Sequence, residues 1–315
     1  MRWVALACVA FSIAGLAGLS GAGTSAVPTS SAPGGTPTFV GDDACLACHQ
    51  DIQKDYEQTV HAKLFRSDAH LETMRQGCEG CHGPGSDHVA AGGGKGVGGM
   101  IQFGSKDPAD ITRANTVCLQ CHLTADRIHW NGSTHEMQGV SCASCHNVMK
   151  NVSTRNLLEE PSQIGTCGQC HLIEKAQTLR YGHMPLRDGT IPDRDGKMTC
   201  TSCHNPHGSV NDALLKFNTV NEACYACHAD KRGPFLWEHP PVLENCMNCH
   251  DPHGSPREYM LRMAPPRLCQ TCHNPTDHPT DPLRPTNSLV IGSGCMQCHA
   301  RIHGSNHPSG QSLTR

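Results

Sequence analysis

The sequence has few of the side chains from which a protein of its size builds a core. Phe, Trp and Tyr together make up 4% of the 315 residues, whereas Gly and Pro contribute 32 and 21 residues. A chain of this length normally folds around one or two apolar cores. Strong hydrophobic periodicity is nevertheless absent beyond the first 20 or so positions. The buried apolar material must therefore come from something other than side chains.

Long hydrophobic runs are also absent, except at the N-terminus. Arg2 precedes an apolar run from Trp3 to Leu19, and small residues follow at Ala22 to Ala26. This order is typical of a secretory signal peptide, which we place at residues 1–26. No later stretch approaches the roughly 18 to 20 apolar residues of a membrane helix. We expect an exported, periplasmic chain whose residues 27–40, rich in Ser, Thr, Pro and Gly, form a disordered arm.

An excess of positive charge is absent too. The formal net charge is −3, which argues against nucleic acid as a partner. The abundant residues are instead Cys and His, with 21 and 22 copies. Apart from Cys8 in the signal, every Cys belongs to a Cys-x-x-Cys pair followed directly by His. These motifs, numbered 1 to 10 in chain order, are Cys45/Cys48/His49, Cys78/Cys81/His82, Cys118/Cys121/His122, Cys142/Cys145/His146, Cys167/Cys170/His171, Cys200/Cys203/His204, Cys224/Cys227/His228, Cys246/Cys249/His250, Cys269/Cys272/His273 and Cys295/Cys298/His299.

The spacing of these motifs predicts covalent haem. In such a motif the two thiols add to the two haem vinyl groups, and the following His ligates the iron as proximal ligand. Structural zinc, a disulfide framework and thioredoxin-like redox pairs are the alternatives, but none requires His directly after the second Cys. We therefore expect ten haem c groups. Their propionates, about 20 in all, would make the holoprotein distinctly acidic.

The motifs repeat as pairs, which predicts five dihaem modules within a cytochrome domain of residues 41–315. Modules 1 to 5 span about 41–100, 101–160, 161–216, 217–262 and 263–315. The first motif of each module is odd-numbered and the second is even-numbered. We expect a multihaem cytochrome c fold, mostly irregular, with short α-helices such as Asp42–Glu57 wrapped around an extended row of ten haems and almost no β-structure. Thioether links and iron ligation would constrain its loops.

Histidines outside the motifs recur at two places in the modules and are the candidate distal iron ligands. The loop histidines lie between the two motifs of a module, and the trailing histidines follow the second motif. The loop histidines are His61, His135, His183, His239 and His278. The trailing histidines are His88, His207, His253 and His303. Module 2 has no trailing His.

The tenth distal ligand is open. Met149 stands three residues after His146, the offset that His207 and His253 occupy after their own motifs. A thioether ligand there would raise the potential of the haem of motif 4. Alternatively, Met149 packs against a haem face. The competing donors are His307, His129 and, more remotely, His70.

A glycine-rich segment, Ala91 to Gly99, lies between the first two modules. Its Lys95 is followed by Gly96 and not by Ser or Thr, so the phosphate-loop pattern fails. Composition favours a flexible loop.

From about Gly41 to its C-terminus the sequence resembles the MtrA/DmsE family of periplasmic decahaem cytochromes. The resemblance rests on ten motifs together with four linkers, GCEGCHGPGSDHVAAGG at 77–93, HWNGSTHEMQGVSCASCH at 129–146, KRGPFLWEHPPV at 231–242 and IHGSNHPSG at 302–310. It implies electron transfer between a periplasmic or inner-membrane cytochrome donor and the outer membrane or extracellular acceptors. It also implies a porin-like β-barrel partner and an outer-surface multihaem cytochrome as acceptor. Met149 is a departure from all-His ligation.

The physics of membranes also favours a β-barrel partner that surrounds the chain. Irregular backbone cannot face lipid, because its amide groups would go unpaired there, so a chain of this kind crosses a membrane only inside a closed barrel. The alternatives are a soluble periplasmic shuttle or electron store, a multihaem reductase, and a filament-forming cytochrome. A reductase site usually alters a motif, and all ten motifs keep His. We therefore expect an electron-transfer protein and not an enzyme.

Overall fold

The computed structural model describes residues 35–67, 77–183, 198–274 and 294–314. The chain divides into two units, Met1–Thr36 and Pro37–Arg315, and the second contains all ten motifs. The expected signal peptide, most of the expected arm, and the candidate ligands His70 and His278 lie outside the described residues.

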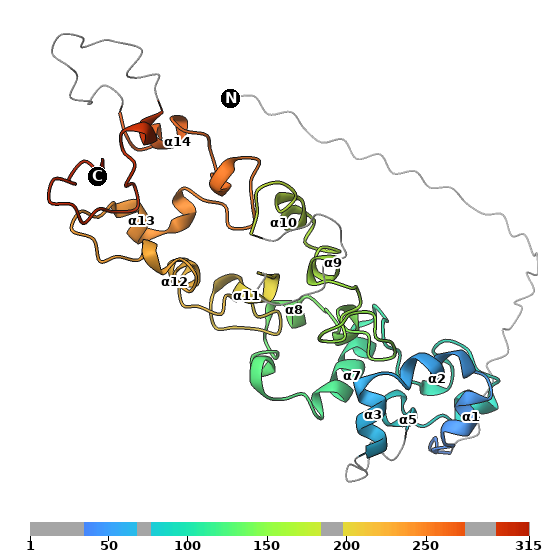
Figure 1. The fold of residues 1–315 in the computed structure, drawn as a ribbon. Helices are drawn as coiled ribbons and strands as arrows, with labels where there is room; N and C mark the ends of the chain where they lie inside the picture. Colours follow the sequence, from blue (N-terminus) through green and yellow to red (C-terminus); the bar gives the residue numbers. More distant parts are fainter. Residues whose placement is uncertain (1–34, 68–76, 184–197, 275–293, 315) are drawn as a thin grey trace, which may run out of the picture. The chain divides into compact units, whose positions relative to one another are not determined.

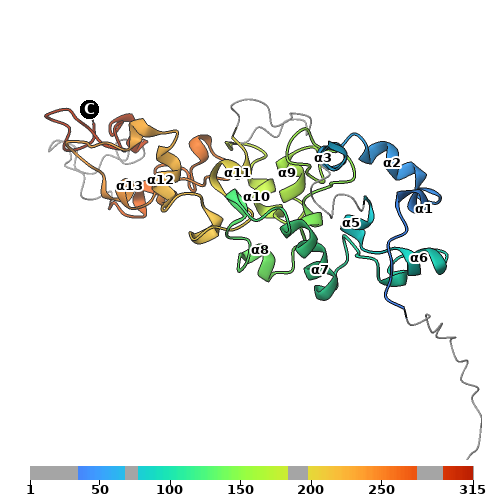
Figure 2. The ribbon, with the colours of Figure 1, turned by 90° about the horizontal axis from the view of Figure 1, so that it is seen from below.

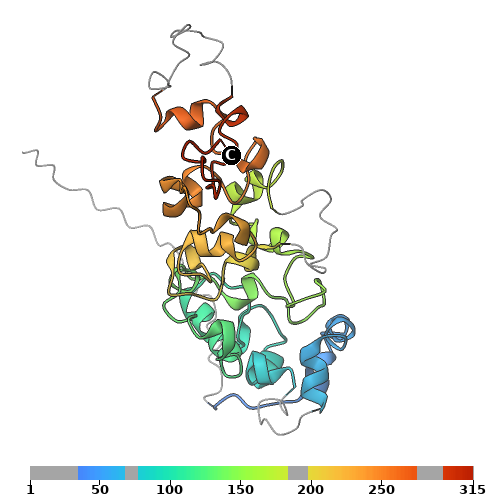
Figure 3. The ribbon, with the colours of Figure 1, turned by 60° about the vertical axis from the view of Figure 1, so that its left-hand side comes forward.

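Short helices and turns make up the second unit (Figure 1 and Figure 3). The α-helices are α1 Asp42–Leu46, α2 Gln50–Tyr56, α3 Val60–Ser67, α5 Glu79–His82, α6 Ser86–Ala90, α7 Pro108–Leu119, α8 Thr134–Met137, α9 Gln163–Cys167, α10 Leu172–Gln177, α11 Cys200–Cys203, α12 Val220–Tyr225, α13 Pro240–Glu244 and α14 Arg267–Gln270. The 3₁₀ turns are η1 Val97–Gly99, η2 Ala125–Arg127, η3 Cys142–Ser144, η4 Asp212–Leu214, η5 Ala229–Lys231, η6 Cys246–Asn248, η7 Glu258–Met260 and η9 Cys295–Gln297.

Extended pairing within the described residues is limited to isolated bridges. Three of them repeat one pattern, in which the His of an even motif pairs with a Leu 11 or 12 residues later: His146 with Leu158, His204 with Leu215 and His250 with Leu261. The expected backbone architecture of short helices and irregular chain, with almost no β-structure, is confirmed for the described residues.

Odd and even motifs lie in different local structures. The first Cys of an odd motif lies in an α-helix, as Cys118 does at the end of α7. Helix α7 begins where the Asp107 carboxylate accepts hydrogen bonds from the amides of Ala109 and Asp110, with Pro108 at its first position. The first Cys of an even motif begins a single turn, as Cys142 does in η3. Each module therefore combines a motif at a helix end with a motif in a tight turn.

The helix expected over Asp42–Glu57 is two helices, α1 and α2. The break falls at motif 1, where His49 leaves the helical region with φ −105° and ψ 37°. The reason is local, because the motif must turn its His out of the helix path to place it beside its own cysteines.

A hydrogen bond from a backbone amide to a polar side chain ties the two motifs of a module together. The Asp42 carboxylate, three residues before Cys45, accepts a hydrogen bond from the amide of Cys78 at 2.8 Å. Three equivalent contacts link later motif pairs: Asn115 Oδ1 with the Cys142 amide at 2.9 Å, Gln163 Oε1 with the Thr201 amide at 3.0 Å, and Asn221 Oδ1 with the Cys246 amide at 2.8 Å. The third contact joins α9 to α11, which lie next to each other (Figure 2).

The protein's own apolar core is small, as the composition predicts. Among the described residues, the buried hydrophobic side chains are Ala62, Ala114, Trp130, Leu158 and Leu261. The polypeptide leaves large apolar side chains such as Ile173 and Leu179 exposed, at 72% and 71%. Side-chain burial alone thus provides little hydrophobic stabilisation, since that stabilisation scales with the apolar area removed from water.

Glu79 anchors the beginning of the folded unit. Its side chain is 2% exposed, and its carboxylate accepts hydrogen bonds from the amides of Val40, Gly41 and Gly85 at 2.7 to 3.0 Å. Thr38 also exchanges two hydrogen bonds with Ser86. The expectation that the disordered arm extends to residue 40 is therefore wrong at its end, because these backbone groups are paired with module 1.

We expect Glu79→Ala to destabilise the N-terminal module, because it leaves the amides of Val40, Gly41 and Gly85 without their acceptor. The expected cost is about 1–3 kcal/mol. Hydrogen exchange of those amides, measured on the holoprotein, should accelerate well above its rate in the parent. Glu244→Ala, at an exposed helix end, is the matched control. Equal exchange at the three amides in the two variants would contradict the anchoring role.

Candidate metal centres

The motif cysteines are free thiols that meet in pairs. Within the described residues none forms a disulfide. In every module the first cysteines of the two motifs are hydrogen-bonded to each other: Cys45 with Cys78, Cys118 with Cys142, Cys167 with Cys200, Cys224 with Cys246 and Cys269 with Cys295. The bond to Cys118 and burial raise the pKa of the Cys142 thiol. The two haem-attachment sites of a module are therefore in contact.

Neighbouring modules approach each other through other cysteines. The second Cys of each even motif, except in module 5, lies close enough to the next motif for that motif's cysteines to raise its pKa, after burial as the main cause. These neighbours are Cys81 with Cys118 and Cys121, Cys145 with Cys170, Cys203 with Cys227, and Cys249 with Cys272. Taken with the pairs inside the modules, every motif lies beside the next one in the chain.

Cys48 and Cys298 are the two predicted attachment residues that differ from the others. Both are exposed, as are Cys121, Cys170, Cys227 and Cys272, but in the described part of the chain neither is seen beside a thiol of another motif, unlike those four. They belong to the first and the last motif of the sequence. Each still has the motif's local turn, in which its amide donates to the carbonyl of Cys45 or Cys295 at 3.2 Å. Their role in haem attachment therefore stays a prediction from the motif, without support from a neighbouring site.

The candidate ligand rings face each other in pairs, each with one motif His and one other His. Their ring centroids are 5.9 to 6.5 Å apart. The pairs are His49 with His88, His122 with His61, His146 with His207, His171 with His135, His204 with His253, His228 with His183, His250 with His303, and His273 with His239.

This separation fits one iron ion between two imidazoles. A metal–imidazole bond is about 2 Å long, and the ring centre lies about 1 Å beyond the nitrogen, so two ligands on opposite sides of a metal place their ring centres about 6 Å apart. Direct stacking of aromatic rings does not require so uniform a spacing. The residues present therefore fit haem iron with two axial histidines, held beside a pair of free thiols.

The pairing crosses module boundaries. Each described loop histidine faces the odd motif of the next module, as His61 of module 1 faces His122 of module 2. Trailing histidines of modules 3 to 5 face the even motif of the preceding module, as His207 faces His146. His88 differs, because it faces His49 of its own module. The sequence repeat located the two sets of histidines but did not reveal which motif each one faces.

Hydrogen bonds to backbone carbonyls orient the rings. In seven of the eight pairs one ring has its Nδ1 bonded to a carbonyl oxygen at 2.7 to 3.1 Å. A carbonyl only accepts, so Nδ1 carries the proton and Nε2 is free for a metal. The bonded rings are His88, His135, His146, His183, His204, His239 and His250. The exception is the pair of His61 and His122.

In motifs 4, 6 and 8 an unusual backbone conformation positions the carbonyl that accepts the hydrogen bond of the motif His. The acceptors for His146, His204 and His250 are Asn156, Ala213 and Tyr259, whose φ angles are +61°, +51° and +56°. This left-handed conformation is strained for residues with a Cβ. Sequence reasoning missed this turn. A signal for it was present, because a Leu recurs two residues after each acceptor, as Leu158, Leu215 and Leu261.

Burial keeps the facing rings neutral, as metal ligation requires. It lowers the pKa of His207 to about 4, with the neighbouring His146 as a further cause. Burial is likewise the main reason that the pKa values of His61, His253 and His303 are lowered. At neutral pH these imidazoles therefore offer a lone pair and not a second proton.

The remaining candidates are placed differently. The ring that faces His146 is that of His207 from module 3, which favours His207 over Met149 as the partner of motif 4. His307 accepts hydrogen bonds at Nδ1 from the amide and hydroxyl of Ser309. The neutral ring of His307 then carries its proton on Nε2, the opposite tautomer from the bonded rings. His129 faces no motif His in the described part of the chain.

Two motif histidines, His82 and His299, stand outside the eight facing pairs. His82 has the ring of Phe103 beside it, edge-on at 5.1 Å. His299 donates from Nδ1 to the carbonyl of Ser312 at 2.6 Å, the same orientation as the bonded rings above. Their second ligands are to be sought among the candidates that remain.

The glycine-rich segment expected to be a flexible loop is packed against a candidate ligand. It contacts α6, and the carbonyl of Val97 accepts the hydrogen bond from His88 at 3.1 Å. Gly98 has φ +73°, and a Cβ there would overlap the backbone of His88. The glycines therefore let this segment pack closely against α6, which carries His88. They do not make it a flexible loop.

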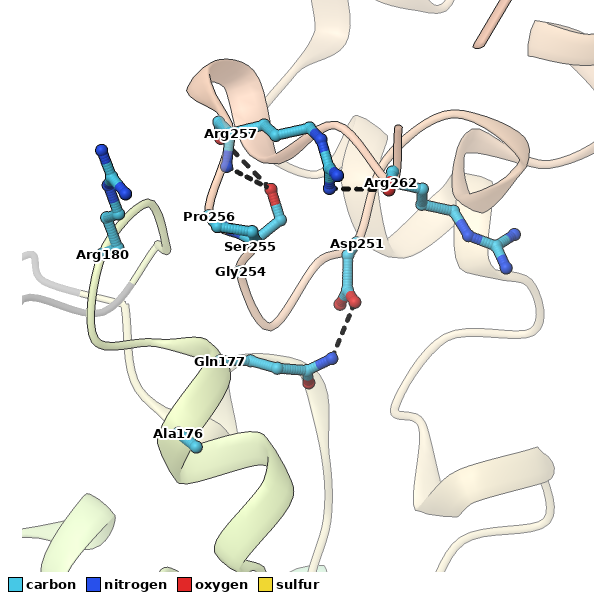
Figure 4. A pocket seen from close by; sticks show the side chains of 9 residues that line it. All are labelled: Ala176, Gln177, Arg180, Asp251, Gly254, Ser255, Pro256, Arg257 and Arg262. Carbon is cyan, nitrogen blue, oxygen red and sulfur yellow. Dashed lines mark hydrogen bonds between the residues drawn. The ribbon is translucent and has the colours of Figure 1, made fainter. Parts of the chain in front are cut away.

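Figure 4 shows the junction between modules 3 and 4. Gln177 at the end of α10 donates to the Asp251 carboxylate at 2.8 Å. Gly254 lies against the backbone of Gln177 and Tyr181. A cavity of about 310 Å³ remains between these segments. The segment after an even motif thus contacts the chain that precedes the loop histidine of the preceding module.

Comparisons with known proteins agree with this geometry. The chain is 41% identical over 286 residues to the multihaem cytochrome MtrA of Shewanella baltica, a match that covers 87% of this chain and 81% of that protein. It is 30% identical over 229 residues to the C-type polyhaem cytochrome OmcB of Geobacter sulfurreducens, covering 60% of this chain and 28% of OmcB. The cytochrome c-type protein NrfB of Escherichia coli is 29% identical over 133 residues, covering 41% of this chain and 65% of NrfB.

Two family models also match. The doubled CXXCH motif matches residues 191–233 and 239–278, and the NrfB-like cytochrome c-type protein matches residues 78–170. The motifs therefore carry multiple covalent c-type haems. Within the described residues, no helix has the length and apolar character needed to cross a membrane.

We expect Gly98→Ala to displace His88 from its position opposite His49, because the new Cβ overlaps the His88 backbone. The reduced variant should then bind about one equivalent of carbon monoxide that the parent does not bind. Gly99→Ala is the matched control, since Gly99 has a similar φ of +76° but open space around it. Carbon monoxide spectra that are the same for both variants would show that packing against His88 does not hold this ligand.

Proposed function

Since the chain belongs to the MtrA family of multihaem c-type cytochromes, we propose that it conducts electrons along a row of ten covalently bound haems. The haems supply reversible one-electron chemistry at iron. The chain's own residues attach them, supply both axial imidazoles and set their order. Electrons would pass between periplasmic donors and the outer membrane or extracellular acceptors, with the chain inside a porin-like partner.

The order of the motifs carries this proposal. The motif cysteines are the attachment points of the haem edges, and each motif meets the next through its sulfur atoms, from Cys45 with Cys78 through to Cys269 with Cys295. Adjacent attachment points bring adjacent haem edges together. A row in chain order follows, in which an electron moves by short steps between neighbours. Cys48 belongs to the first motif of this row and Cys298 to the last.

The axial ligands we propose are the eight facing pairs of histidines described above. His278 remains the ninth distal candidate, for a motif outside the eight facing pairs. In modules 3 to 5 the trailing histidine faces the even motif of the preceding module. By the same rule Met149, which follows motif 4, would face motif 2. Met149 is therefore a candidate for the haem of His82, together with His70.

A second imidazole at most of the sites favours electron transfer over catalysis. A reductase needs one iron position open to substrate, whereas in eight of the ten motifs a second His ring stands opposite the motif His. We therefore propose that the chain is not an enzyme, and that its partners are a cytochrome donor, a porin-like protein and a surface multihaem cytochrome.

The haem count is testable by intact mass. The purified mature chain should carry ten haems, because every motif keeps both cysteines and its His. A mass lower by one haem or more would contradict the count. Cys167→Ala/Cys170→Ala should lower the mass by one haem and leave nine.

The same variant tests conduction. The complex of the chain with its porin-like partner, co-purified from native membranes, is reconstituted in vesicles that enclose reduced methyl viologen. External Fe(III) should oxidise the dye with the parent, and the rate should fall at least tenfold when motif 5 loses its haem, because the gap interrupts the row. Lys54→Ala, at the end of the exposed helix α2, is the control. Recovery of the chain entirely without a membrane partner would favour the periplasmic shuttle instead.

A further inference from the structure

Three of the four junctions between neighbouring modules are closed by the same contact, which we call the His-Gly-Ser clasp. Its segments are His207–Ser209, His253–Ser255 and His303–Ser305. The Gly of each segment has a positive φ, +116°, +129° and +135°. A Cβ at these positions would overlap the carbonyl of His129, the carbonyl of Gln177 and the ring of Phe235, respectively. Only glycine therefore permits this close an approach, to backbone at Gly208 and Gly254 and to the Phe235 ring at Gly304.

The clasp positions a carbonyl for the loop histidine of the preceding module. The residue before each clasp is Pro206, Pro252 or Ile302, and its carbonyl accepts the Nδ1 hydrogen bond of His135, His183 or His239 at 2.8, 3.1 and 3.0 Å. Because Ile302 serves as well as the two prolines, the acceptor does not need to be proline. The requirement is the close backbone approach.

The junction between modules 1 and 2 lacks the clasp. Met149, Lys150 and Asn151 stand where the other modules have His, Gly and Ser. Two side-chain contacts replace it: Lys150 Nζ pairs with the Asp55 carboxylate at 3.1 Å, and Asn151 Nδ2 donates to the carbonyl of Gln58 at 2.9 Å. Both contacts bridge the two modules without the backbone approach that glycine allows.

The loop histidine at this junction lacks its acceptor. His61 Nδ1 is buried and has no hydrogen-bond partner among the described residues. Its facing ring, His122, lies at a centroid distance of 6.0 Å and has no carbonyl bond within the described part of the chain. The other seven ring pairs each have one such bond. The missing clasp and the unpaired nitrogen therefore occur at the same junction.

Hydrogen bonding at Nδ1 changes the electron donation of an axial imidazole. An N–H donated to a carbonyl makes the ring a stronger donor, which stabilises ferric over ferrous iron and lowers the reduction potential. We propose that the haem of motif 3, ligated by His122 and His61, has a higher reduction potential than its counterparts at motifs 5, 7 and 9. This inference rests on the proposed row of bis-histidine haems. It adds a site within the row where an electron resides longer than on those counterparts.

The test restores the clasp. In Lys150→Gly/Asn151→Ser the segment regains glycine and serine while Met149 is kept, so no new histidine ligand is introduced. Lys150→Ala/Asn151→Ser loses the same charge and the same two side-chain contacts but cannot adopt the positive φ freely. A redox titration of each holoprotein, followed optically, should show one haem with a lower midpoint in the Gly variant than in the Ala variant. Identical titration curves would overturn the inference.

The converse variant provides an independent measurement. Gly208→Ala should separate the carbonyl of Pro206 from His135 and raise the midpoint of one haem, that of motif 5. Gly139→Ala is its control, because Gly139 also has a positive φ, +70°, but open space around it. An unchanged midpoint in Gly208→Ala would contradict the inference.

Electron paramagnetic resonance of the oxidised parent separates this inference from the proposed function. Low-spin iron with two imidazole ligands at the sites of the eight facing pairs upholds the row whatever the potentials are. High-spin iron in the parent at the sites of the eight facing pairs would contradict the row, and the inference with it.

Discussion

Two imidazole rings that face each other about 6 Å apart are the contact on which the rest of this structure depends. In seven of the eight described pairs the two rings come from neighbouring modules, so a site with the spacing that suits iron is complete only when both modules are in place. Iron ligation at these sites would do the work that a side-chain core does elsewhere. This explains how so few buried hydrophobic residues suffice, and why so much of the chain is irregular between its attachment points.

The rings are held by the backbone more than by other side chains. Carbonyl oxygens accept the Nδ1 hydrogen bonds, and they are brought into place by positive φ angles at Asn156, Ala213 and Tyr259 or by close glycine contacts at Gly208, Gly254 and Gly304. Strained backbone is costly, and it persists where surrounding contacts determine it. Here the thioether attachments and the iron ligands on either side provide that constraint.

The chemistry could be predicted from the sequence, whereas the register could not. The motifs specify covalent haem because their spacing is the reaction geometry itself, and the scarcity of aromatic side chains indicates the fold class. Which His faces which motif depends on contacts between segments up to 71 residues apart, such as His135 with Pro206. Position within a module therefore suggested Met149 for motif 4, although the ring there belongs to His207. Glycine content suggested flexibility at 91–99, because composition does not show that Gly98 packs against His88.

The borrowing of ligands has a consequence for how such a chain can change in length. Each interior module gives one loop histidine to its successor and receives one from its predecessor, as module 3 gives His183 and receives His135. A duplicated module inserted at a clasped junction would find a donor before it and a recipient after it, so a conductor of this kind can lengthen by gene duplication without redesign of its sites. Module 1 differs, because its His88 faces the motif of its own module. A duplicate of module 1 would therefore keep that pair within itself.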